Sequence, residues 1–162
     1  MDILSTIIIY GIACSFLISI VVLAQLWYNP RLLLQDYPKD VQQQVPPKTP
    51  AEKRVSTYWA VVLFLLMLAF PLAAALSSKA AHHSFLEVFL SAFGVLFLFN
   101  LVDLLVMDWL IVCTITPKFL VIPGTEGMAG YKNYAMHFKG LLIGTGVSVV
   151  LSLLFTTLVM FL

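Results

Sequence analysis

The residues best placed to do chemistry are those near Asp103, which lies inside a long apolar stretch of the chain. Asn100 and Met107 lie three residues before and four residues after it, so a regular helix puts all three on one face. An ionised carboxylate at mid-membrane depth costs about 2.5–3.5 kcal/mol on insertion scales. We therefore expect Asp103 to face a bundle interior, a water-filled cavity or a cationic partner.

Two interpretations of Asp103 remain open at this point. The functional one is a ligand-binding carboxylate. The structural one is an ion pair with Lys118, Lys139 or Arg31. Asp108 lies five residues further on, so a regular α-helix points it to another side, near the membrane interface. There it is expected to be solvated or paired with a lysine.

The segment from Thr116 to Lys139 contains further groups that bear on this site. Its second half is aromatic and basic, which favours an interfacial anchor as the first interpretation. If the segment folds back under the helices, an imidazole and phenols meet the carboxylates in an acid–base or metal site. The candidate catalytic residues are then Asp103, Asp108 and His137. The candidate ligand-binding residues are Asn100, Asp103, Met107, Tyr131, Tyr134 and His137.

No motif specifies the chemistry further. The sequence has no HExxH motif, no histidine pair spaced to share one metal from a helix and no CxxC. We therefore assign no metal ligands, and the cofactor is undetermined. Whether the protein is an enzyme is open as well.

These residues must be positioned by helices in a membrane. Hydrophobic residues make up 61% of the 162 residues and charged residues 10%, against about 45–50% and about 25% in soluble domains. A membrane-spanning helix needs about 20 mostly apolar residues. Four stretches qualify: Ile3–Trp27, Val55–Leu76, Phe85–Ile115 and Leu141–Leu162. The predicted fold is all-α, a polytopic four-transmembrane-helix bundle that forms one domain over residues 1–162.

Local signals mark several helix ends. Thr49 to Glu52 and Ser84 to Glu87 have the form of capping boxes, the first with Pro50 at the first helical position. Asn29 and Pro30 predict a stop followed by a short helix with Leu32, Leu33 and Leu34 on the membrane surface. The third stretch is overlong, because 31 helical residues extend about 46 Å across a hydrocarbon core of about 30 Å. It is expected to tilt, bend or protrude.

The positive charges predict the orientation. Eight of the nine Lys and Arg residues lie in the first and third connections, and only Lys79 lies in the second. By the positive-inside rule the first and third connections are cytoplasmic loops with short interfacial helices, and both termini are outside. We expect a bacterial inner membrane for so compact a chain.

Small residues on the last helix predict close packing. Gly140, Gly144, Ser148 and Ser152 recur every four residues, beginning with a GxxxG motif, and such a row lets another backbone approach. Contact within the bundle is the first interpretation. A homodimer seam is the alternative.

Three functions follow as hypotheses. The first is a small membrane protein that binds a lipidic or amphipathic ligand in a cytoplasm-facing cavity near Asp103. An extension of this hypothesis is that the protein also moves the ligand across the bilayer. The second is a membrane-embedded enzyme acting on a lipid headgroup at the same surface. The third is an accessory subunit that holds a partner membrane protein through its last helix. Membrane lipid is the expected partner, and the net charge of +1 gives no reason to expect nucleic acid.

Overall fold

The computed structural model describes residues 2 to 161, and within them the chain is all-helical. Helix accounts for 83% of the structure, with no strand among the described residues. The elements in chain order are α1 (Ile3–Tyr28), η1 (Pro30–Asp36), α2 (Lys39–Gln44), α3 (Pro50–Ala80), α4 (Phe85–Val102), η2 (Asp103–Ile115), η3 (Ala129–Lys132) and α5 (Tyr134–Phe161). Leu162, the last residue of the predicted fourth span, lies outside the described residues.

Four helices are long and apolar enough to cross a membrane, in agreement with the sequence prediction. They are α1, α3, the continuous helix formed by α4 and η2, and α5. Their outer faces carry many exposed large apolar side chains, such as Phe16, Leu65 and Leu154 at 64%, 59% and 60% exposure. In water such a surface would be unfavourable, whereas hydrocarbon tails are as apolar as these side chains. The fold is compatible with a multi-pass membrane protein.

Capping boxes begin two of the long helices. The Thr49 and Ser84 side chains accept from the backbone N–H groups of Glu52 and Glu87, and each glutamate reaches back to its cap, so both predicted capping boxes are confirmed. α3 therefore begins before its apolar stretch. α5 does the same, because Asn133 Oδ1 accepts from the N–H of Met136 at 3.0 Å and the helix starts at Tyr134.

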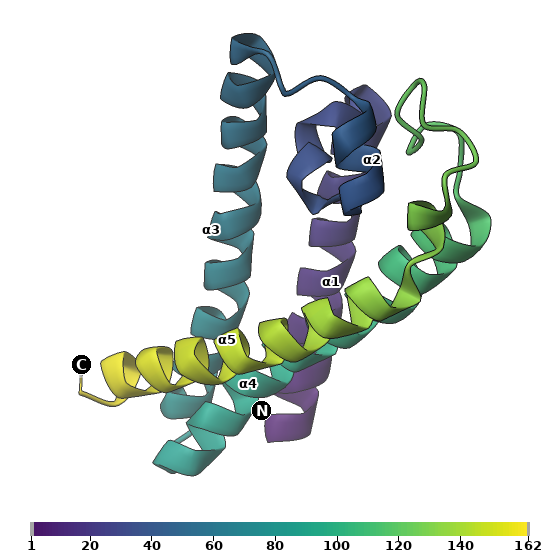
Figure 1. Cartoon of the computed structure of the whole chain (residues 1–162). Coiled ribbons are helices and arrows are strands. Elements are labelled where there is room, and N and C mark those ends of the chain that lie inside the picture. Colours follow the sequence, from purple (N-terminus) through teal and green to yellow (C-terminus); the bar gives the residue numbers. More distant parts are fainter. Residues whose placement is uncertain (1, 162) are drawn as a thin grey trace.

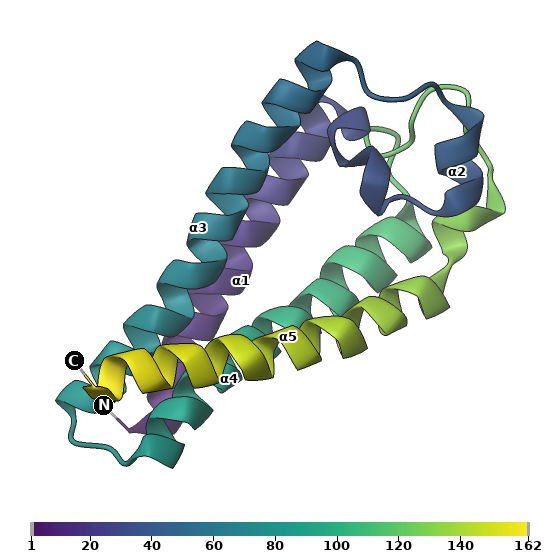
Figure 2. The same ribbon diagram turned by 60° about the vertical axis from the view of Figure 1, so that its left-hand side comes forward.

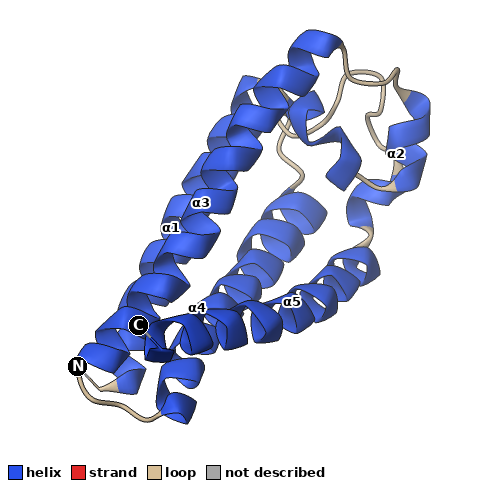
Figure 3. Cartoon of the chain, turned by 90° about the vertical axis from the view of Figure 1, so that its left-hand side faces the viewer, coloured by secondary structure: helices blue, strands red, loops and turns tan. Residues whose placement is uncertain are grey.

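The long helices form two pairs that diverge like the arms of a V (Figures 1 and 2). α1 lies beside α3, and α4 with η2 lies beside α5. The arms meet at the end that carries both termini and separate toward the loops, as Figure 3 shows. Two polar contacts hold the closed end: Ser78 donates to Ser91 at 2.8 Å, and the Lys79 ammonium donates to the carbonyl of Val159 at 2.6 Å.

The third long helix is the centre of the fold. α4 contacts α1, α3 and α5, and 39% of the most apolar window of the third helix is buried, against 17–22% in the other three. Its partners approach closely at glycines. A Cβ on Gly11 would lie 2.7 Å from Leu98, and a Cβ on Gly94 would lie 2.5 Å from Ile7. Small residues at these positions allow the backbone contact that stabilises helix association in lipid.

The overlong third helix changes its winding at Asp103. From Asp103 to Ile115 it is a π-helix, in which each N–H bonds to the carbonyl five residues earlier. The last such bond joins the Thr116 N–H to the Ile111 carbonyl at 2.8 Å. A π-helix has more residues in each turn and therefore rises less per residue. The excess length is absorbed partly by this wider winding, which the sequence did not predict.

The short helix η1 differs from its predicted setting. Leu32 and Leu34 are 1% and 8% exposed, because η1 folds against the end of α1 and the segment after η2. Their prediction as membrane-surface residues is wrong. Apolar side chains at a loop can be buried in the protein when a second loop covers them, and here residues 117–132 supply that cover.

The row of small residues on α5 faces α4. Ser148 accepts from Asn100 Nδ2 at 3.0 Å, and a Cβ on Gly144 would lie 2.7 Å from Asn100 Oδ1. Ser152 is fully buried as well. Gly140 differs, since nothing lies within 4 Å of the position of its Cβ.

We predict that Gly144→Leu destabilises the monomer. Overpacking at a close contact costs about 1–3 kcal/mol, so the melting temperature in detergent should fall by several degrees. Gly146→Leu is the matched control, because Gly146 lies on the same helix with open space around its Cβ position. Equal melting temperatures for the two variants would show that the Asn100 contact does not hold α4 and α5 together.

Candidate functional site

A cavity of about 430 Å³ lies between the diverging arms, and we call it the wedge cavity. Its walls come from every long helix and from both large loops. The apolar lining consists of Ile18, Val22, Leu26, Leu33, Pro38, Leu63, Met67, Phe99, Met107, Val112 and Leu120. The polar lining consists of Asp36, Tyr37, Asp103, Asp108, Tyr131 and His137. An apolar chamber with a few converging polar groups is the usual form of a small-molecule site.

Asp103 and Asp108 both line the wedge cavity. The expectation that Asp108 points to another side is wrong, because it assumed a regular α-helix. In a π-helix the backbone N–H of each residue bonds to the carbonyl five residues earlier. Residues five apart therefore lie one above the other, and the two carboxylates share a face. The change of winding begins at Asp103 and brings both carboxylates to the interior instead of one.

His137 completes this group from the facing helix. Its Nδ1 lies 3.0 Å from Asp108 Oδ1. Because α5 begins at Tyr134, His137 belongs to its first turn and extends from α5 toward η2. Asp108 is therefore paired with an imidazole rather than with a lysine. A carboxylate bonded to one ring nitrogen orients a histidine and leaves its other nitrogen for proton transfer.

Asp103 forms no ion pair with a lysine or arginine of the described residues. Of the three cations considered for it, Arg31 forms an ion pair with Glu52 at 2.7 Å. Lys118 and Lys139 are exposed, and neither lines the wedge cavity. The structural interpretation of Asp103 as half of an ion pair thus finds no partner within residues 2–161.

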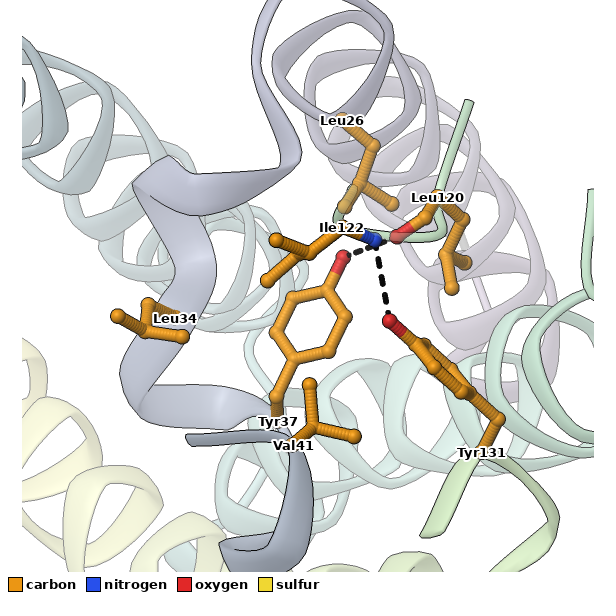
Figure 4. Packing of buried hydrophobic residues seen from close by; sticks show 7 residues of the cluster. All are labelled: Leu26, Leu34, Tyr37, Val41, Leu120, Ile122 and Tyr131. Carbon is orange, nitrogen blue, oxygen red and sulfur yellow. Dashed lines mark hydrogen bonds between the residues drawn. The ribbon is translucent and has the colours of Figure 1, made fainter. Parts of the chain in front are cut away.

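The segment after η2 folds back and closes the open end of the V. Tyr37 donates to the carbonyl of Leu120 at 2.7 Å, and Tyr131 accepts from the N–H of Ile122 at 3.1 Å (Figure 4). Thr125 donates its hydroxyl proton to the Ile122 carbonyl at 2.6 Å, so the 2.7 Å contact between Thr125 and Tyr131 uses the Tyr131 proton. Both phenols are fully engaged with this segment, and their rings remain as cavity lining.

A second contact holds the same two loops together. Asp40 accepts from the N–H of Gly130 at 2.9 Å. A Cβ on Gly130 would lie 2.1 Å from the Asp40 carboxylate, so only glycine permits this approach. Hydrogen bonds to a charged acceptor contribute about 1.5–3 kcal/mol. Loop closure over the cavity therefore depends on contacts between residues far apart in the sequence.

The remaining predicted residues are divided between the cavity and other positions. Met107 is 4% exposed and lines the wedge cavity, together with Tyr131. Asn100 and Gly140 line the adjoining mouth between η1, α2 and α5. Tyr134 lies away from both openings, since it is 40% exposed and its hydroxyl lies 3.0 Å from that of Thr114.

The sequence analysis missed three polar residues that face this region. Asp36 at the end of η1 and Tyr37 directly after it line both the cavity and its mouth. Gln25 lines a recess that adjoins the cavity. Gln25 is a buried amide within an otherwise apolar stretch, which was the one available signal. No sequence signal marked Asp36, because it reaches the cavity only when η1 folds under the long helices.

The charge of Asp36 is influenced by its surroundings. Burial raises the pKa of its carboxyl above the ordinary value, and the nearby Lys48 ammonium and a hydrogen bond from Gln35 oppose that change. Lys48 donates to the Leu32 carbonyl at 2.9 Å and to Ser56 at 3.0 Å, so it is directed at η1 and α3.

The arrangement can bind a polar head group and transfer a proton. Its carboxylates accept hydrogen bonds, and the pair of Asp108 and His137 has the geometry of an acid–base group. Within residues 2–161 no group of three His, Cys, Asp or Glu side chains is placed to hold a metal ion.

No protein-family model, curated protein sequence or solved structure matches this chain.

Proposed function

We propose that this protein is an integral membrane protein that binds a lipidic or amphipathic ligand in the wedge cavity, with Asp103 at its polar end. The observation that carries the proposal is the composition of the cavity: apolar walls from α1, α3 and α4 lead to carboxylates from η1 and η2. A ligand with a hydrocarbon chain and a polar head matches both parts. The volume of about 430 Å³ is within the range of small-molecule sites, about 300–1,000 Å³.

The proposal includes a second step, in which the protein moves the bound ligand between the two leaflets. The arms of the V meet at one end and separate at the other (Figure 2). A cavity that opens toward one membrane surface favours exchange with that surface. Hinge-like motion of one helix pair against the other would move the opening, because the two pairs pack closely only near the termini.

We further propose that the loop end faces the cytoplasm of a bacterial cell, with the cavity in the inner half of the membrane. The eight Lys and Arg residues of the first and third connections support this orientation. We predict that a reporter fused after residue 162 is active outside the cytoplasm, and that one inserted between α2 and α3 is active inside. The reverse pattern would place the cavity in the outer half.

Filling the wedge cavity should remove its ligand. We predict that Met67→Trp abolishes the lipid adduct that native mass spectrometry detects on the purified protein, because Met67 lines the cavity. Leu65→Trp is the matched control on the same helix, since Leu65 is 59% exposed on the outer surface. An adduct that survives Met67→Trp and is lost with Leu65→Trp would locate lipid on the outside of the bundle and contradict the proposal.

An enzyme acting on a lipid headgroup is the second candidate, and the 3.0 Å contact between Asp108 and His137 is the observation that favours it. We predict that a binding protein loses its adduct with Asp103→Asn and keeps it with His137→Ala. In an enzyme both variants abolish release of headgroups from phospholipid vesicles. If the parent protein releases headgroups and His137→Ala does not, the protein is an enzyme.

The accessory-subunit hypothesis has no supporting contact. Gly144 and Ser148, which were its proposed docking residues, lie against Asn100 of the same chain. A partner protein would have to use a different surface.

A further inference from the structure

We propose that the ligand of the wedge cavity is a long-chain amine, with a protonated amino group held by Asp103, Asp108 and Asp36. This inference rests on the proposed function and specifies the head group. The hydrocarbon chain would lie against the wall that α1 and α3 form. Four observations support a cationic head group with N–H donors.

The first observation is the sign of the charges that face the cavity. Its ionisable lining consists of three carboxylates, two phenols and one imidazole, and the imidazole is paired with Asp108. No Lys or Arg of the described residues lines the cavity itself, and Lys39 lies at its outer mouth. Carboxylates in a chamber of low polarity are stabilised by a positive charge brought between them.

The second observation is that the nearby cations are engaged elsewhere. Arg31 binds Glu52 and also donates to the Pro46 carbonyl at 3.1 Å. Lys132 donates to the carbonyl of Thr114 at 3.1 Å at the end of η2. Asp103 receives no hydrogen bond from a described residue. Within residues 2–161 no Lys or Arg pairs with Asp103, and His137, the one basic side chain in the same cavity, is bonded to Asp108.

The third observation is independent of the carboxylates. Gln25 is 1% exposed, and its carbonyl oxygen Oε1 has no hydrogen-bond donor. A buried acceptor without a donor costs about 1–3 kcal/mol. Gln25 lines a recess that shares Leu33, Asp36, Leu63 and Met67 with the wedge cavity. An unsatisfied acceptor in a recess shared with Asp36 favours a ligand that carries N–H or O–H donors.

The fourth observation concerns the aromatic lining. The hydroxyl groups of Tyr37 and Tyr131 are bonded to the loop backbone and are not available to a ligand (Figure 4). Their rings, with Phe99, therefore face the cavity as aromatic surface. A cation is attracted to the face of an aromatic ring, and an anion is not. An anionic head group would meet no Lys or Arg of the described residues in the cavity, and the one imidazole there is already paired with Asp108.

The test measures binding of three probes with the same chain: hexadecylamine, its N-acetyl amide and hexadecanoate. Calorimetry is performed on the protein in phosphatidylcholine nanodiscs, and protein-free nanodiscs correct for partitioning. We expect the amine to bind about tenfold more tightly than either other probe, which is the effect of one charge-assisted hydrogen bond. Equal or tighter binding of the amide or the carboxylate overturns the amine assignment and leaves the proposed function intact.

Variants locate the head group. Asp103→Asn with Asp108→Asn should weaken amine binding about tenfold and leave amide binding within about twofold. Asp2→Asn is the matched control, because it removes one negative charge at the opposite end of α1 and keeps an N-cap side chain. An equal loss in the control would show a general charge effect and overturn the assignment. If the double variant does not fold, the relative affinity of the parent protein for the three probes still tests the amine assignment.

Two further results separate the amine assignment from the proposed function. Gln25→Leu should raise the melting temperature of the ligand-free protein and weaken amine binding, because it removes the unsatisfied oxygen. A lower melting temperature with unchanged amine affinity would contradict the role of Gln25. If Met67→Trp leaves the binding of all three probes unchanged, no ligand occupies the wedge cavity and both proposals fail.

Discussion

Asp103 and Asp108 lie on one long apolar helix, where a carboxylate that faced hydrocarbon would be costly, and the arrangement of the other elements agrees with keeping both inside. Asp103 and Asp108 would diverge on a regular α-helix, so that one of them would face lipid or another helix. The π-helical winding of η2 places both on the inner face. The two arms then cannot close along their full length, because closing would bury the charges without solvent or a partner. The V shape is consistent with this requirement.

The open end of the V is closed by loops rather than by helices. Leu26, Leu34, Tyr37, Val41, Leu120, Ile122 and Tyr131 form one buried cluster at that end. Tyrosine suits this position, because its ring is apolar and its hydroxyl satisfies backbone groups of the opposite loop. The cluster excludes water from one side of the cavity, and the mouth between η1, α2 and α5 remains. A ligand would enter by that mouth or between the arms.

The closed end of the V has a different physical basis. Apolar burial does not drive helix association in lipid, so packing and hydrogen bonds between helices have to stabilise it. Glycines at positions 11 and 94 allow α1 and α4 to approach closely, and the bond from Ser78 to Ser91 joins α3 to α4. The two arms are in contact at this end, and the cavity with its carboxylates lies toward the other end.

The sequence by itself determined the four long apolar helices, two capping boxes and the presence of Asp103 within the third apolar stretch. These features are local: they depend on hydropathy over about 20 residues, on side chains three positions apart and on the cost of charge in lipid. Only the tertiary structure decided which residues surround Asp103. The π-helix changes which residues share a face, and Asp36, Tyr37 and His137 reach the cavity through contacts such as that between Tyr37 and Leu120, 83 residues apart. No local pattern encodes such contacts, because they depend on how the two loops fold against each other.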